Sequence, residues 1–100
     1  MGNELDAVIH PPKRLGAMAM LTAARWVEFS FLRENLDVTD SDLSKQMSAL
    51  CDAGYATVRK HGRGPGSRTW FAATPAGRLA LQRHVAALRA MVEQAPIAPD

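Results

Sequence analysis

The sequence predicts a single domain that is mainly α-helical and carries a small β-hairpin. Its 100 residues are a usual length for one domain with one hydrophobic core. With 47% hydrophobic and 22% charged residues, the composition is that of a folded globular protein. Three features indicate the fold class: a well-capped helix near the middle, two strand-like segments around a glycine-rich turn, and a long helix near the end.

The N-terminal segment, residues 4–24, is expected to form two helices. A short helix over residues 4–9, with its apolar residues on one side, would end at the proline pair that follows. A second helix is expected from Lys13 to about Ala24, because apolar residues follow helical spacing there. Residues 26–29 then alternate briefly, as a short strand does.

Residues 30–54 are expected to form two helices joined by a tight turn. Ser30 is a candidate N-cap for a helix that ends at Asn35. Thr39 opens the second helix and is followed three residues later by Asp42, an arrangement similar to a capping box. The inward side of this helix has apolar residues at i, i+4 and i+7, namely Leu43, Met47 and Leu50.

The last part of the chain predicts a hairpin and a long helix. Gly54 supplies a left-handed stop for the preceding helix. Residues 55–73 form two strands around a turn, and Thr74 then caps a helix over residues 75–94 that has proline at its first position. The apolar surface of this helix exceeds what so small a core can cover, so we expect it to be a dimerisation helix.

The predicted order, α-α-β-α-α-β-β-α, is that of a winged helix-turn-helix, whose second paired helix fits the major groove of DNA. A rotation of about 100° per residue turns Ser41, Lys45 and Ser48 outward, with Ser44 on one flank and Gln46 on the other. Serine hydroxyls can contact bases or phosphates, lysine can reach guanine or phosphate, and glutamine can pair with adenine if the helix tilts toward it. The alternative is a plain surface helix with solvated serines.

The glycine-rich turn at 61–67 is expected to project as a mobile loop, with Arg63 at its tip and Lys60 and Arg68 at its base. No acidic residue occurs in the range 53–92, and such a basic segment suits a polyanion or, alternatively, is only a soluble face. Arginine is favoured in a narrow minor groove, and the flanking cations would neutralise phosphates. A phosphate-binding loop would lead into a helix, whereas a strand follows here.

Catalytic and metal-binding functions find little support in the sequence. His10, His61 and His84 lack the spacing of a zinc site, and no nucleophile-base pair can be proposed, so we expect neither an enzyme nor a cofactor. Cys51 is expected to be a small packed residue, with a redox-sensing thiol as the alternative. No apolar run approaches the ~20 residues that span a bilayer, and we expect a cytoplasmic protein.

Several segments in order resemble the short, single-domain winged-helix transcriptional regulators of the MarR/ArsR type: HPPKRL, LDVTDSDLSKQMSALCDAGY, VRK and RTWFAATPAGR, followed by a long closing helix. The resemblance implies a homodimer whose first and last helices form the interface. It implies DNA contacts from the second helix of the pair and from the wing: Ser41, Ser44, Lys45, Gln46, Ser48, Arg63 and Arg68. Any small-molecule effector would bind between the dimer helices and the helix-turn-helix.

Together these features predict a homodimeric transcriptional regulator that binds specific sequences of double-stranded DNA. The recognition helix, residues 40–53, would enter the major groove, and the wing, residues 61–68, would contact the backbone or the minor groove. The alternative is a winged-helix module that binds a protein partner without specific DNA binding.

Overall fold

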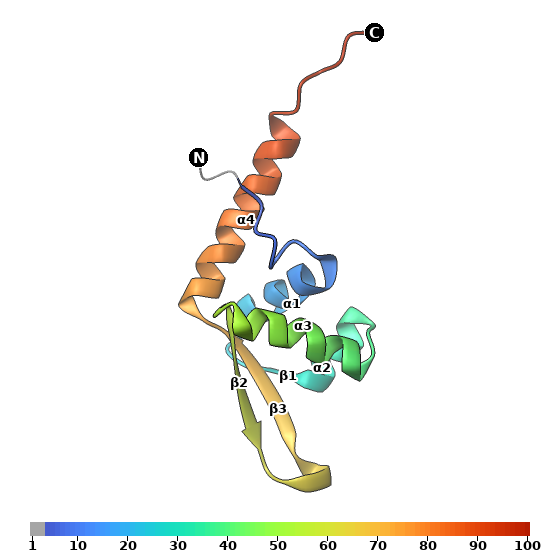
Figure 1. The fold of residues 1–100 in the computed structure, drawn as a ribbon, viewed down its shortest axis with the longest axis vertical. Helices are drawn as coiled ribbons and strands as arrows, with labels where there is room; N and C mark the ends of the chain where they lie inside the picture. Colours follow the sequence, from blue (N-terminus) through green and yellow to red (C-terminus); the bar gives the residue numbers. More distant parts are fainter. Residues whose placement is uncertain (1–3) are drawn as a thin grey trace.

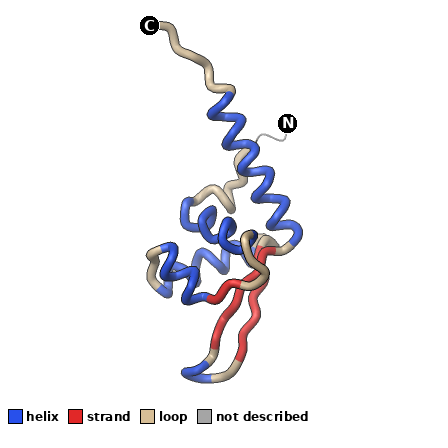
Figure 2. The backbone as a smooth tube through the Cα atoms, turned by 180° about the vertical axis from the view of Figure 1, so that it is seen from behind, coloured by secondary structure: helices blue, strands red, loops and turns tan. Residues whose placement is uncertain are grey.

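The computed structural model describes residues 4–100 and confirms the winged helix-turn-helix (Figure 1). Its elements in chain order are α1 (Pro12–Thr22), β1 (Val27–Glu28), α2 (Phe29–Leu36), α3 (Asp40–Asp52), β2 (Ala56–His61), the 3₁₀ turn η1 (Gly64–Gly66), β3 (Arg68–Ala73) and α4 (Pro75–Glu93). The first three helices form a compact body. The β2-β3 hairpin projects from one end of this body and the C-terminal half of α4 from the other (Figures 1 and 2).

The expected helix over residues 4–9 is wrong. Residues 7–9 form a turn instead, in which the backbone N–H of His10 donates to the carbonyl oxygen of Asp6 at 2.8 Å. The Asp6 carboxylate also accepts the backbone N–H groups of Val8 and Ile9, which ties the segment into a turn and not a helix. The first helix is therefore α1, slightly shorter than the expected helix from Lys13 to Ala24.

The expected N-cap at Ser30 is also wrong, because α2 begins at Phe29, two residues before the start that this N-cap would give. Its N-cap position is Glu28, which has extended backbone angles and makes no capping hydrogen bond through its side chain. Glu28 is paired with Trp70 in the sheet. The strand pairing thus holds the chain extended up to Glu28, and the helix starts directly after it.

The three strands form an antiparallel sheet in the order β1-β3-β2. In the hairpin, the pairing continues from Ala56 opposite Ala73 to His61 opposite Arg68. Side chains alternate between the two faces of a strand, so residues paired across the sheet lie on the same face. Val58 and Lys60 therefore face α3, whereas Arg59 lies on the opposite face of the hairpin.

The core lies where the first three helices meet the base of the sheet. The expected inward side of α3 is confirmed, since Leu43, Met47 and Leu50 are each no more than 1% exposed. The remaining buried apolar side chains of the cluster are Ile9, Ala17, Met18, Leu21, Val27, Leu32, Ala56 and Phe71. This burial fixes the rotation of α3 and so decides which of its polar side chains face outward.

The N-cap expected for α3 is confirmed, because the side-chain oxygen of Thr39 accepts the backbone N–H of Asp42 at 3.1 Å. The reciprocal half of a capping box is replaced, since the Asp42 carboxylate accepts hydrogen bonds from Lys13 and Gln46 instead. The expected stop is also confirmed: Gly54 follows the helix with a φ of 80°.

Replacing Thr39 with alanine should lower the free energy of unfolding by about 1 kcal/mol, because one N–H of the first turn loses its acceptor. Urea denaturation followed by circular dichroism measures this change. Thr39→Ser keeps the hydroxyl and should stay close to the wild type. Equal stability of the alanine and serine variants would contradict the capping role.

Candidate nucleic-acid interface

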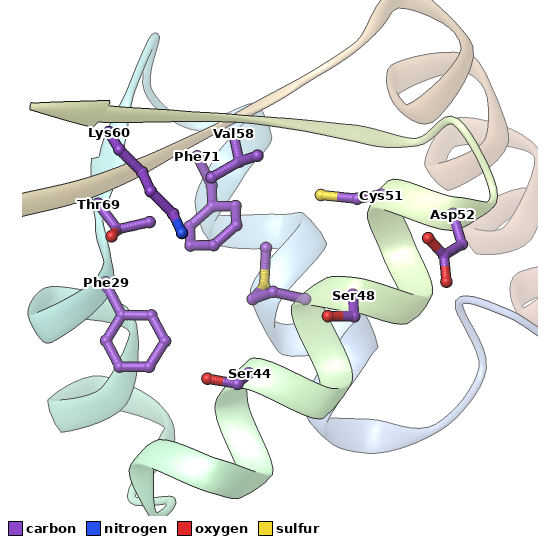
Figure 3. A pocket seen from close by; sticks show the side chains of 10 residues that line it. Phe29, Ser44, Ser48, Cys51, Asp52, Val58, Lys60, Thr69 and Phe71 are labelled. Atoms are coloured by element: carbon purple, nitrogen blue, oxygen red, sulfur yellow. The ribbon is translucent and has the colours of Figure 1, made fainter.

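An open groove of about 390 Å³ separates α3 from the inner face of the hairpin (Figure 3). Three of the predicted DNA contacts lie together along it: Ser44 and Ser48 from α3, and Lys60 from β2. The other side chains that line the groove are Phe29, Met47, Cys51, Asp52, Val58, Thr69 and Phe71. The groove thus has polar and cationic edges over a largely apolar floor.

The local structure explains why these three side chains converge. Ser44 and Ser48 are one helical turn apart, and both are exposed because the buried side of α3 holds the helix in one rotation. Lys60 is turned toward α3 by the alternation of side chains along β2. In Figure 3 the side chains of Ser44 and Lys60 extend into the same space from opposite walls.

Thr69 lines the groove but is not among the residues predicted from the sequence. It lies opposite Lys60 in the hairpin register and therefore shares its face. Strand alternation could have identified Thr69, but only once the register of the hairpin was known. Its hydroxyl adds another polar group to the wing side of the groove.

Two predicted contacts on α3 lie outside the groove on the exposed outer side of the helix, namely Ser41 and Lys45. Gln46 is turned toward α1 instead. Its side-chain oxygen accepts a hydrogen bond from Nε of Arg14 at 2.9 Å, and its amide nitrogen donates to the Asp42 carboxylate at 2.9 Å. The structure therefore does not bring Gln46 together with the other predicted contacts.

The wing cations are distributed over both faces of the hairpin. Arg68 pairs with His61 in the register, so it lies on the face opposite Lys60, with its Nε 3.9 Å from the Glu28 carboxylate. Arg63 is exposed at the end of the hairpin, just before η1. Arg59, on the same face as Arg68, stacks over Trp26 with 4.1 Å between the guanidinium carbon and the ring centroid.

Two of the three acidic residues of α3 are engaged by the fold. Asp40 and Asp42 lie in its first turn, where negative charge is favoured by the helix dipole. Hydrogen bonds from Lys13 and Gln46 hold the pKa of Asp42 below its ordinary value. Asp52 is the acidic residue that remains in the groove, at the C-terminal end of α3.

Cys51 lines the same groove, and its thiol packs against the core. It is partly buried against the core, and burial together with the charge of Asp52 raises its pKa. A raised pKa lowers the thiolate fraction at neutral pH, and the thiolate is the reactive form. This favours the packed residue over the redox sensor.

Residues 4–100 contain no group of three or more His, Cys, Asp or Glu side chains arranged to hold a metal ion. None of the described helices combines the length and the apolar character needed to cross a membrane.

Comparison with known proteins identifies the family. A family model described as a winged helix DNA-binding domain matches residues 13–92. A transcriptional regulator homologue from Pyrococcus horikoshii OT3 is 26% identical, with a TM-score of 0.80 over 90% of this chain and 89% of that chain. No curated protein sequence matches the chain.

Two further solved structures share the fold. A "possible transcriptional regulator for arsenical resistance" is 23% identical, with a TM-score of 0.68 over 90% of this chain and 94% of that chain. A zinc-responsive MarR family member from Lactococcus lactis is 12% identical, with a TM-score of 0.59 over 91% of this chain and 58% of that chain. The structural neighbours are thus transcriptional regulators of the MarR/ArsR type, and the chain belongs to the winged helix DNA-binding domain family.

Proposed function

We propose that the protein is a homodimeric transcriptional regulator that binds specific sites on double-stranded DNA. The observation that carries this proposal is the convergence of Ser44, Ser48 and Lys60 on one open groove between α3 and the hairpin. With α3 in the major groove and the hairpin at the adjacent minor groove, the sugar-phosphate strand between them would occupy this groove. Hydroxyls and an ammonium group are the partners that phosphate oxygens require.

The two faces of the hairpin fit this arrangement. A hairpin placed at a minor groove has a DNA strand on each side, so Lys60 and Arg68 on opposite faces would contact different strands. Arg63 at the end of the hairpin would reach into the minor groove, where the negative potential favours arginine. Ser41 and Lys45 on the outer side of α3 would contact base edges or phosphates in the major groove.

Gln46 is a candidate base contact only if it gives up its present partners. Its amide is held by Arg14 and Asp42, so direct pairing with adenine would cost two hydrogen bonds inside the protein. We therefore assign base readout first to Ser41 and Lys45, and to Gln46 a role in holding α3 against α1.

The homodimer is supported by apolar side chains on α4. Val85 is 40% exposed, Met91 56% and Val92 78%, all in the C-terminal half of α4. A second copy would cover these side chains, and a symmetric dimer would present two α3 helices to successive major grooves about 34 Å apart.

A small-molecule effector would fit the cavity of about 290 Å³ between the N-terminal segment and α4.

A matched pair of wing variants tests the DNA-binding proposal. Lys60→Gln should weaken binding to genomic DNA fragments and make the negative slope of log K against log salt shallower by about 0.9, because one phosphate contact is lost. Arg59→Gln removes the same charge from the adjacent residue on the other face, where the guanidinium rests on Trp26, and should have a smaller effect. Fluorescence anisotropy over a potassium chloride series measures both.

Equal losses for the two variants would mean that only net charge matters, and the groove assignment would be wrong. An unchanged salt slope in Lys60→Gln would contradict the contact itself. Failure of the wild type to retain any genomic fragment at physiological salt would contradict DNA binding altogether.

The alternative function, binding of a protein partner, is favoured by one observation on the opposite face of the sheet. A cavity of about 260 Å³ there is lined by aromatic residues, Trp26, Phe31 and Trp70, and Phe31 is 54% exposed. Exposed aromatic side chains are enriched at protein interfaces. A co-purifying protein, together with no retention of DNA, would favour this alternative.

A further inference from the structure

The segment between residues 6 and 10 is tied to several parts of the fold at once. The Asp6 carboxylate accepts the backbone N–H groups of Val8 at 2.9 Å and of Ile9 at 3.3 Å, which fixes the turn. Ile9 is fully buried in the core. We refer to residues 6–10 as the N-terminal turn.

One set of hydrogen bonds joins the N-terminal turn to α4 and to the residue before β2. The backbone N–H of Asp6 donates to Nδ1 of His84, on α4, at 2.9 Å. Nε2 of His84 lies 3.2 Å from Nδ1 of His10. The Tyr55 hydroxyl, just before β2, donates to the other oxygen of the Asp6 carboxylate at 2.6 Å.

A second set of bonds joins the same turn to α3. The carbonyl oxygen of Val8 accepts a hydrogen bond from Nη1 of Arg14, on α1, at 3.2 Å. Nε of the same guanidinium donates to the side chain of Gln46, on α3, at 2.9 Å. A continuous series of hydrogen bonds therefore runs from α4 through the N-terminal turn and Arg14 to α3.

We propose that the N-terminal turn is a connector that transmits the protonation state of His84 on α4 to the position of α3. The proposal rests on the proposed function for its biological consequence, since α3 is the helix assigned to DNA. Asp6 and Arg14 act in it as positioning residues: neither lines the groove at which DNA would bind, and both hold the elements that do.

His84 suits this role because its bonds specify one protonation state. Nδ1 accepts an N–H, so the neutral ring carries its proton on Nε2 and donates it toward His10. A second proton, on Nδ1, would point at the backbone N–H of Asp6. Two donors cannot share a hydrogen bond, so the bond to the N-terminal turn would break. The ring is 1% exposed, so water cannot readily replace the lost partner.

The surrounding charges act on His84 in both directions. Burial, followed by the neighbouring His10, lowers the pKa of His84, whereas the Asp6 carboxylate opposes this shift. Hydrogen bonds from Tyr55, Val8 and Ile9 outweigh burial and hold the pKa of Asp6 below its ordinary value, so Asp6 stays ionised while His84 titrates. The other charged side chains at this cavity are Glu4 and Arg83.

The sign of the pH effect follows from the lowered pKa. In the unfolded chain His84 takes up a proton near its ordinary value of 6.5, whereas in the folded chain it does so only at lower pH. The unfolded state therefore binds more protons in this window, and the connector loses stability as the pH falls below about 6.5. Above that pH the contribution is fully present.

The test is a pH titration of the whole chain by ¹H–¹⁵N NMR from pH 7.5 to 5.0. Backbone amides of Ser44, Gln46 and Ser48 should shift with the same midpoint as the His84 ring. His84→Asn places an amide oxygen near the position of Nδ1 and does not titrate, so these shifts should be absent in it. Shifts of α3 that persist in His84→Asn would overturn the proposal.

Arg14→Ala interrupts the route without touching His84. The ring should still titrate in this variant, and the response of α3 should fall at least severalfold. An undiminished response would overturn the proposed route through Arg14. This second variant keeps the test decisive even if His84→Asn folds poorly.

Binding to genomic DNA fragments at pH 7.5 and 5.5, at constant salt, supplies a separate readout. The wild type should lose severalfold more affinity on acidification than His84→Asn, because only the wild type can take up a proton at this position. Equal losses would contradict transmission to DNA. If no DNA is bound at either pH while the NMR response is intact, the proposed function fails and the connector stands.

Discussion

Replacing Gly77 with alanine is expected to destabilise the protein severely. A Cβ at this position in the first turn of α4 would lie 2.0 Å from the carbonyl oxygen of Tyr55 and 2.9 Å from its carbonyl carbon. Both are backbone atoms of the residue just before β2, and they cannot rotate away as a side chain could. The backbones of α4 and the residue before β2 must therefore separate.

Separation at this point disturbs more than one contact. The same carbonyl oxygen of Tyr55 accepts the backbone N–H of Thr74, and the Thr74 side chain caps α4. We expect a loss of about 3 kcal/mol or more, which the higher helix propensity of alanine, worth ~1 kcal/mol, offsets only in part. For a domain of this size, that is a large share of the total stability.

Gly66→Ala is the matched control for this experiment. Gly66 lies in the 3₁₀ turn of the wing, and a Cβ there would meet nothing within 4 Å. Its effect should stay within about 0.5 kcal/mol. Urea denaturation of both variants gives the comparison, and similar midpoints for the two would show that α4 and the wing are not in close contact at Gly77.

The sequence was most informative where local chemistry decides the structure. Thr39 caps α3 and Gly54 follows its end with a positive φ, and both act on neighbouring residues. The hairpin is likewise decided locally, by strand-forming segments on both sides of a glycine-rich turn. These elements, and with them Ser44 and Ser48 on the exposed side of α3, were predicted correctly.

The errors occur where a distant partner decides. Residues 4–9 have helical spacing of apolar residues, yet Asp6 is held by Tyr55 and by His84, which is 78 positions away. The place of Gln46 on the helix predicts a DNA contact, which stays a prediction, but gives no sign that Arg14, 32 positions away, binds its side chain. Neither contact leaves a periodic signal in the sequence.

The hairpin shows a third limit. The strands were predicted, but not their register, and the register decides which side chains share a face. The sequence alone therefore groups Lys60 and Arg68 at the base of the loop, whereas the register puts them on opposite faces of the hairpin. It also gives no sign of Thr69, which lies opposite Lys60. The register therefore decides which cation of the hairpin can contact which part of a bound DNA.

Replacing Val85 with glutamate is expected to convert the proposed dimer to monomers. Val85 is 40% exposed in the single chain, so the substitution should leave the monomer folded. In a dimer joined through α4, the new carboxylate would be buried without a partner, at a cost of about 3 kcal/mol or more in each subunit. Light scattering coupled to size-exclusion chromatography gives the molar mass, and Val92→Glu should give the same result.

Ala86→Glu provides the control, because Ala86 is exposed and points about 100° away from Val85 around the helix. It introduces the same charge next to the same site and should leave the dimer intact. Loss of the dimer should also weaken DNA binding by about hundredfold or more. Each monomer then binds a single half-site and loses the gain in affinity that comes from two linked sites. A Val85→Glu protein that stays dimeric would place the interface elsewhere, and a monomeric one with unchanged affinity would show that a single α3 and its wing account for binding.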